Sequence, residues 1–140
     1  MKLILYTCLA SLLVTVTFAG EKGAPSYKDY GEVKTLLAAK CYPCHGALKQ
    51  KAKLRLDTRD LMLKGEVILA GQAAKSLLIE RVEDMGEDRM PPPGEGEALK
   101  PAEIALLRRW IDSGARAPAG ESVPPGPAEH WAFQVPRRRP

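Results

Sequence analysis

Cys41-Tyr42-Pro43-Cys44-His45-Gly46 places two cysteines three residues apart, with a histidine directly after the second. Residues three apart share one face of a helical turn, so the two thiols point the same way. C-x-x-C-H is the arrangement to which a c-type haem attaches, with each thiol bonded to one vinyl group and the imidazole on the iron. The motif therefore predicts one covalent haem c held by Cys41, Cys44 and His45.

The same residues admit three other interpretations, which stay open at this point. A disulfide redox pair has this cysteine spacing, but it normally lies in a strand, a turn and a helix, and no strand is predicted here. A zinc site needs four ligands, and only His130, in the distant tail, is left to complete the set. An inert disulfide would suit an exported chain. Haem attachment is favoured because the residues match its motif in type, spacing and order.

Haem iron bound by one histidine has a second axial position, for which we predict Met90. A thioether sulfur binds iron weakly, so a rigid backbone is needed to hold it in place. The three prolines after Met90 supply this rigidity. Met85 is the main rival, and His130 would instead give a bis-histidine iron. Met62 is expected to pack in the core.

Four helical segments are predicted from periodic apolar residues and from helix start and stop signals. The first runs directly into the cysteines, and the second has Asp57 and Thr58 as candidate caps. The last begins with a proline in its first turn and has Leu107 and Trp110 on its apolar side. The four are Tyr30–Lys40 with Val33, Leu36 and Leu37 as its stripe, a short helix within Leu54–Gly65, Ala73–Val82 with Leu77, Leu78 and Val82, and a helix from Pro101 that ends at Gly114.

The fold class predicted from these segments is all-α. No segment alternates as a strand would, and the stretch from Met90 to Gly96 must be a loop because three consecutive prolines lack amide donors. With 140 residues, 12 glycines, 12 prolines and only 2 phenylalanines, the chain has little material for a core of its own. A large apolar macrocycle would give short helices something to pack on.

Residues 1–19 are predicted to be a secretory signal peptide, with cleavage after Ala19. Lys2 precedes an apolar run that ends in small residues, and Cys8 would leave with the segment. An uncleaved membrane anchor is the alternative, because the run is nearly long enough to span a bilayer. Either way the protein is expected to be exported, to the periplasm or beyond, with no membrane span once the signal is removed.

The formal charge of +4 does not indicate nucleic-acid binding, because the excess lies at the ends of the chain. Four of the 21 basic residues are Lys2 and Arg137–Arg139, and the others balance the 17 acidic residues. Two runs of opposite sign remain, which predict two solvated faces in preference to a surface that docks a partner. They are Lys49, Lys51, Lys53, Arg55 and Arg59, and Glu80, Glu83, Asp84, Glu87 and Asp88.

Taken together, the motifs make the chain resemble the planctomycete-type cytochrome c domain, a relative of the small class I cytochromes c. The resemblance covers Glu32 to about Ala117. Ala52-Lys53 departs from the pattern, since a pair of glycines would be more usual there, and this affects the expected path of that loop. The segments that carry the resemblance are Cys41–Gly46, Leu54-Arg55-Leu56-Asp57, Lys75-Ser76-Leu77-Leu78-Ile79, Met90-Pro91-Pro92 and Ile104–Gly114 around Trp110.

The resemblance implies a class I cytochrome c-like helical fold around one covalent haem, with His45 and Met90 as iron ligands and Cys41 and Cys44 as attachment points. It also implies further C-terminal domains. The expected division is a signal segment at 1–19, a haem domain at 20–117, and a Pro- and Gly-rich linker with the start of a following domain at 118–140.

Electron transfer outside the cytoplasm is the predicted function, because an iron with histidine and methionine ligands has no free site for a substrate and methionine raises its potential. The redox partner is a protein that the sequence does not identify. Two alternatives remain: a peroxidase-like haem module, and a structural or sensory haem module of a larger protein.

Overall fold

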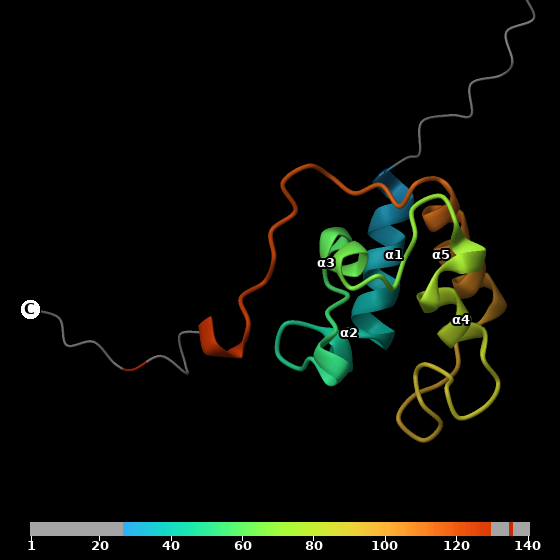
Figure 1. The fold of residues 1–140 in the computed structure, drawn as a ribbon, viewed down its shortest axis with the longest axis horizontal. Helices are drawn as coiled ribbons and strands as arrows, with labels where there is room; N and C mark the ends of the chain where they lie inside the picture. Colours follow the sequence, from blue (N-terminus) through green and yellow to red (C-terminus); the bar gives the residue numbers. More distant parts are fainter. Residues whose placement is uncertain (1–26, 130–134, 136–140) are drawn as a thin grey trace, which may run out of the picture.

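The structure is a computed structural model that describes residues 27–129 and residue 135 (Figure 1). The described residues contain helices and no strands, which confirms the all-α fold class. The predicted signal segment at 1–19 lies outside the described part, as does His130. The α-helices are α1 (Tyr27–Lys40), α2 (Tyr42–His45), α3 (Arg59–Lys64), α4 (Leu77–Glu83) and α5 (Pro101–Asp112), and the 3-10 turns are η1 (Lys51–Lys53), η2 (Ala73–Lys75) and η3 (Pro127–Glu129).

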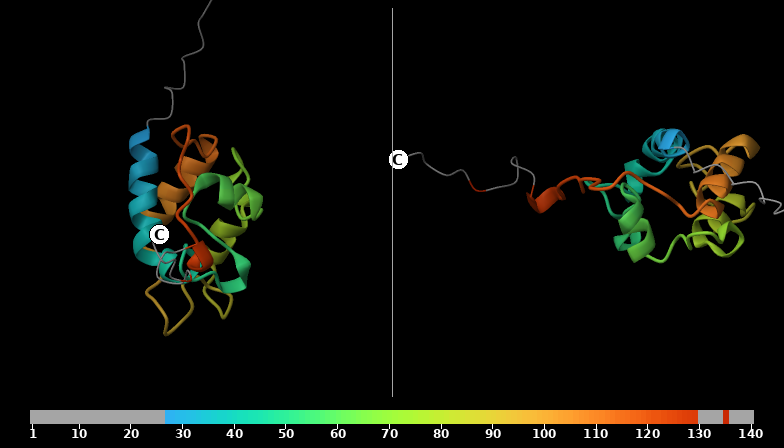
Figure 2. Two further views of the ribbon diagram at one scale, coloured as in Figure 1. Left: turned by 90° about the vertical axis from the view of Figure 1, so that its left-hand side faces the viewer. Right: turned by 90° about the horizontal axis from the view of Figure 1, so that it is seen from above.

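Helices α1 and α5 pack together and form the centre of the core (Figures 1 and 2). On α1 the side chains of Val33 and Leu37 are fully buried, as the apolar spacing predicted. On α5 Leu107 and Ile111 are fully buried beside Trp110, whose ring stacks on Tyr30 with centroids 5.6 Å apart. This packing against α5 fixes the position of α1, and the chain enters the cysteine motif directly after the last residue of α1.

Helix α3 begins and ends where the sequence predicted. The Thr58 side chain accepts a hydrogen bond from the Leu61 amide at 3.3 Å, and Gly65 follows the last turn. Thr58 is therefore the cap of the two candidates, and Asp57 instead pairs with Arg55. Met62 is fully buried, as expected for a core residue.

The prediction of one continuous helix over Ala73–Val82 is wrong. The chain forms η2, breaks at Ser76 and then forms α4. Ser76 is buried, and its hydroxyl donates to the Gln72 carbonyl at 3.0 Å and accepts from the Leu69 amide at 2.9 Å. A serine that finds backbone partners in this way favours a turn over a continuous helix. As a result Leu77 is 38% exposed, whereas Leu78, Ile79 and Val82 face the core.

In the loop after the cysteine motif the backbone is left-handed at two residues that are not glycine. Ala52 has φ of 55° and Lys53 has φ of 57°. A residue with a Cβ is strained in this region, whereas glycine enters it freely. The left-handed backbone explains why glycines would be more usual at these two positions. In this chain the backbone adopts the same conformation with Ala52 and Lys53 in their place.

We expect Ala52→Gly to raise the free energy of unfolding by roughly 0.5–1 kcal/mol, because relief of the left-handed strain exceeds the added entropy of the unfolded chain. Chemical denaturation of the haem-loaded protein measures the change. The control is Ala38→Gly at an exposed position of α1, where the same substitution lowers stability by up to about 1 kcal/mol. Equal losses at both positions would contradict the explanation.

The segment after α5 is irregular but makes several specific contacts with the helices. It leaves α5 and passes over α1 and beside α3 (Figure 1). The Glu121 carboxylate accepts hydrogen bonds from the Tyr30 hydroxyl at 2.6 Å, the Lys34 ammonium at 2.7 Å and the Arg59 amide at 3.0 Å. Further along, Arg55 donates to the Pro124 carbonyl at 2.8 Å. Nothing in the sequence pattern singled out Glu121.

Glu121 is expected to make stability depend on pH. Burial by itself would raise the pKa of its carboxyl, but hydrogen bonds from Lys34 and Tyr30 outweigh it and hold the pKa below its ordinary value of 4.5. A lowered pKa contributes stability above about pH 4.5 that is lost as the pH falls through the folded-state value. Urea titrations between pH 6 and pH 3 should therefore show a steeper acid loss for the parent than for Glu121→Gln, while the exposed Glu87→Gln behaves like the parent.

No helix in the part of the chain that the structure describes is both long enough and apolar enough to cross a membrane.

Candidate functional site

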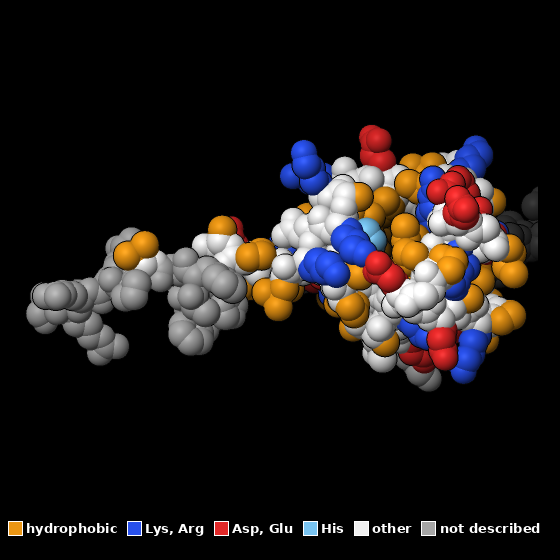
Figure 3. All heavy atoms as spheres, turned by 90° about the horizontal axis from the view of Figure 1, so that it is seen from below, with side chains coloured by type: hydrophobic (Ala, Val, Ile, Leu, Met, Phe, Trp, Pro, Cys, Tyr) orange, Lys and Arg blue, Asp and Glu red, His pale blue; other side chains and the backbone are white. Residues whose placement is uncertain are grey.

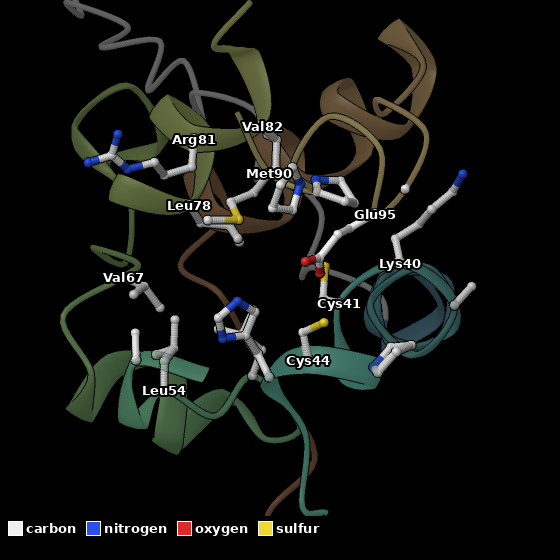
Figure 4. A pocket seen from close by; sticks show the side chains of 18 of the residues that line it. Lys40, Cys41, Cys44, Leu54, Val67, Leu78, Arg81, Val82, Met90 and Glu95 are labelled. Atoms are coloured by element: carbon white, nitrogen blue, oxygen red, sulfur yellow. The ribbon is translucent and has the colours of Figure 1, made fainter. Parts of the chain in front are cut away.

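A cavity of about 470 Å³ opens between two walls of the fold. One wall is the end of α1, α2 and the loop behind it, and the other is α4 with the loop that begins at Met90 (Figure 4). Its volume lies in the range of about 300–1,000 Å³ that is typical of small-molecule and cofactor sites. Its lining is mostly apolar, including Leu54, Leu56, Val67, Leu78 and Val82.

The end of α1 delivers the two cysteines to this cavity. The Cys41 amide donates to the Leu37 carbonyl at 2.8 Å, and the His45 amide donates to the Cys41 carbonyl at 2.8 Å. The chain therefore turns once at Cys41 and continues as α2, where Pro43 lies in the first turn and costs no hydrogen bond. One helical turn then separates Cys41 from Cys44.

Both thiols line the cavity, half-buried and not joined to each other. Figure 4 shows their sulfur atoms on the α2 wall. Burial raises the pKa of the Cys41 thiol to about 11, and the neighbouring Cys44 adds to the shift. Cys41 is thus a protonated thiol at neutral pH.

His45 lines the same wall with its ring held in one tautomer. Its Nδ1–H donates to the Lys51 carbonyl at 3.1 Å, because a carbonyl can only accept. Nε2 is then the unprotonated nitrogen, which is the one able to bind a metal. Burial lowers the pKa of the imidazole, which also favours the neutral form.

Gly46 follows His45 for a steric reason that the sequence analysis did not identify. A Cβ at this position would lie 2.6 Å from the Tyr42 carbonyl oxygen, closer than real side chains approach. The backbone of α2 therefore folds tightly against residue 46, and this lets the chain return toward Lys51 behind the imidazole.

The four sulfur and imidazole candidates for the second axial position lie in different places. Met90 lines the wall opposite the cysteines, and its amide donates to the Arg81 carbonyl of α4 at 2.8 Å (Figure 4). Met85 is 93% exposed and does not line the cavity, and Met62 is fully buried in the core. His130 lies outside the described residues.

The loop from Met90 to Gly96 is shaped by its own contacts. Its Met90-Pro91 peptide bond is cis, and the Glu95 amide donates to the Pro92 carbonyl at 3.0 Å. A Cβ at Gly96 would lie 2.8 Å from the Pro91 ring, so the loop closes on itself at that glycine. The predicted loop is confirmed, and it presents both Met90 and Glu95 to the cavity.

Ion pairs that the sequence did not predict connect the two walls at the rim of the cavity. Lys51 pairs with Glu95 at 2.7 Å, and Lys40 pairs with Glu97 at 3.5 Å. Basic and acidic side chains are accordingly intermixed on the lower face of the molecule (Figure 3). Members of both charged runs also have partners elsewhere, as in the Arg55–Asp57, Arg59–Asp60, Arg81–Asp88 and Arg108–Glu83 pairs.

These residues fit the predicted haem in their chemistry. Two free thiols and an imidazole with an available Nε2 line one wall of an apolar cavity, and a thioether lines the other. This is one donor set with which a protein holds a covalent, six-coordinate haem. No cluster of three or more histidine, cysteine or acidic side chains that could hold a metal ion directly is found within residues 27–129.

Residues 41–94 match the family model described as Planctomycete cytochrome C. The matched region begins at the first cysteine of the motif and ends within the loop from Met90 to Gly96. No curated protein and no solved structure matches the chain.

Proposed function

We propose that this chain, which carries a planctomycete-type cytochrome c domain, binds one haem c and passes single electrons outside the cytoplasm. A haem-binding cytochrome domain follows from the family, and the number of haems, the electron transfer and the compartment are the proposal. The observation that supports it is a single apolar cavity whose two walls carry the complementary parts of one donor set.

Each donor has one proposed role. Cys41 and Cys44 are the attachment points, and His45 binds the iron through Nε2 while the Lys51 carbonyl holds its other nitrogen. Met90 would bind the iron from the opposite wall. When bound, haem iron supplies a reversible one-electron couple, and a thioether ligand raises its potential. With His45 and Met90 both bound to the iron, no site would be left for a substrate, so the chain would act as a carrier and not as a catalyst.

The haem-binding unit is proposed to extend beyond the expected boundary at residue 117. Glu121 bonds to α1 and to the first residue of α3, and Pro124 accepts from Arg55. These contacts are part of the same fold as the cavity. We also propose that residues 1–19 direct export, since Lys2 and the apolar run that ends in small residues have the pattern of a secretory signal peptide.

Covalent attachment is the direct test. The chain is expressed with a c-type maturation system, purified and extracted with acidified solvent. We expect the haem colour to stay with the protein, and Cys41→Ala/Cys44→Ala to lose it. Complete extraction of haem from the parent protein would overturn the proposal.

Absorption spectra then distinguish an electron carrier from a haem catalyst. Both redox states are recorded with and without cyanide or carbon monoxide. A low-spin spectrum with slow ligand uptake is expected, because Met90 occupies the sixth position. A high-spin ferric spectrum with rapid uptake would contradict the carrier role.

A further inference from the structure

Lys51 makes contact with both sides of the cavity. Its backbone carbonyl accepts the Nδ1–H of His45 at 3.1 Å. Its side-chain ammonium pairs with the Glu95 carboxylate at 2.7 Å. One residue therefore touches the imidazole on one wall and the loop of Met90 on the other.

The backbone around Lys51 fixes the direction of both contacts. The Leu54 amide also donates to the Lys51 carbonyl, at 3.1 Å, so this oxygen is held by two donors. The left-handed residues Ala52 and Lys53 make the turn that brings the Leu54 amide back to it. The left-handed conformation of these two residues is strained, and it persists because the surrounding contacts hold the turn in place.

Glu95 lies in the same short loop as Met90, and contacts within this loop connect the two residues. Its amide bonds to the Pro92 carbonyl, and Gly96 next to it closes on the Pro91 ring. Figure 4 shows the Glu95 side chain reaching from the Met90 loop toward the wall of Cys41 and Cys44. A displacement of Glu95 thus displaces the short rigid loop that begins at Met90.

We propose that Lys51 is a positioning residue that ties the two axial ligands to each other, so that its ion pair with Glu95 holds Met90 on the iron. The proposal rests on the proposed function, in which His45 and Met90 are those ligands. A thioether is a weak ligand, so even a modest interaction changes how often it is displaced. The Lys40–Glu97 pair at 3.5 Å is a second and longer tie across the same rim.

The pair is exposed, with 41% of the Lys51 side chain and 53% of the Glu95 side chain accessible, so its effect is limited in size and sensitive to salt. An exposed pair at this distance corresponds to an equilibrium factor of up to about fivefold. We therefore expect about that change in the displacement of Met90, and a smaller one at high ionic strength.

The test uses the haem-loaded protein and follows the sulfur-to-iron charge-transfer band while imidazole displaces Met90. Lys51→Glu keeps the carbonyl bond to His45 and repels Glu95, so the imidazole concentration at half-displacement falls by about fivefold. Lys51→Met, which removes the charge without adding repulsion, gives a smaller shift in the same direction. Lys51→Glu/Glu95→Lys restores the pair and the parent value. Lys53→Glu is the matched control, with the same charge change two residues away.

The outcomes separate this proposal from the one on which it rests. If the parent protein holds covalent haem and shows the band, but Lys51→Glu and Lys53→Glu shift it equally, the positioning role is wrong and only general charge acts. If the double reversal fails to restore the parent value, the pair with Glu95 is not the cause. If the parent shows no covalent haem or no band, the proposed ligands themselves are wrong.

Discussion

We expect Met90→Ala to remove the sulfur-to-iron charge-transfer band completely and Met85→Ala to leave it unchanged. The two side chains are five residues apart in sequence and differ in their surroundings. Met90 lines the cavity opposite the cysteines, and its backbone is fixed to Arg81 of α4. Met85 is 93% exposed among acidic neighbours and does not line the cavity. Of these two methionines, only Met90 lines the cavity that His45 also lines.

The effect of Met90→Ala is expected to be confined to the axial position. Its side chain is 37% exposed, so truncation removes few core contacts and the fold persists. The proposed covalent bonds through Cys41 and Cys44 would keep the haem on the protein. Absorption spectra should therefore show intact haem that binds carbon monoxide rapidly in its reduced state. A band that survives in Met90→Ala and disappears in Met85→Ala would move the ligand to Met85.

The parts of the fold that were predicted correctly are those determined by local pattern. The stripe on α1 and the cap at Thr58 depend on residues within one or two helical turns, so periodicity and capping rules apply directly. The predicted helix over Ala73–Val82 failed because the hydroxyl of Ser76 bonds to the backbone of Leu69 and Gln72. Apolar spacing alone does not reveal such a competing hydrogen bond.

The candidate site divides in the same way. The donors are recognisable because Cys41, Cys44 and His45 form a motif with defined chemistry, and Met90 precedes a run of prolines. The residues that connect distant parts of the fold were not recognisable. Lys51 and Glu95, which link the two walls, lie 44 residues apart, and Tyr30 and Glu121, which link α1 to the segment after α5, lie 91 apart. Polar and charged residues at such separations have no shared pattern in one sequence, so their pairing depends on the tertiary fold.

Trp110→Ala should cost about 3–5 kcal/mol of unfolding free energy, the largest stability loss expected of any single substitution here. Trp110 is 2% exposed, and its ring stacks on Tyr30 of α1. Its Nε1–H donates to the Arg116 carbonyl at 2.9 Å, which anchors the start of the segment that carries Glu121. Truncation opens a cavity between α1 and α5 and releases this anchor at the same time. A loss of this size is a large share of the total stability of a small domain, about 5–15 kcal/mol.

Trp110→Phe distinguishes packing from the hydrogen bond. It keeps an aromatic ring against Tyr30 but has no donor for the Arg116 carbonyl, so a smaller loss of roughly 1–3 kcal/mol is expected. Denaturation followed by far-ultraviolet circular dichroism measures both variants, because helix content reports on α1 and α5 together. The spectrum of the haem below the transition should not change, since Trp110 does not line the cavity.

If Trp110→Ala costs less than about 1 kcal/mol of unfolding free energy, the contact between α1 and α5 is not the centre of the core. The haem must then supply more of the stability than the packing suggests.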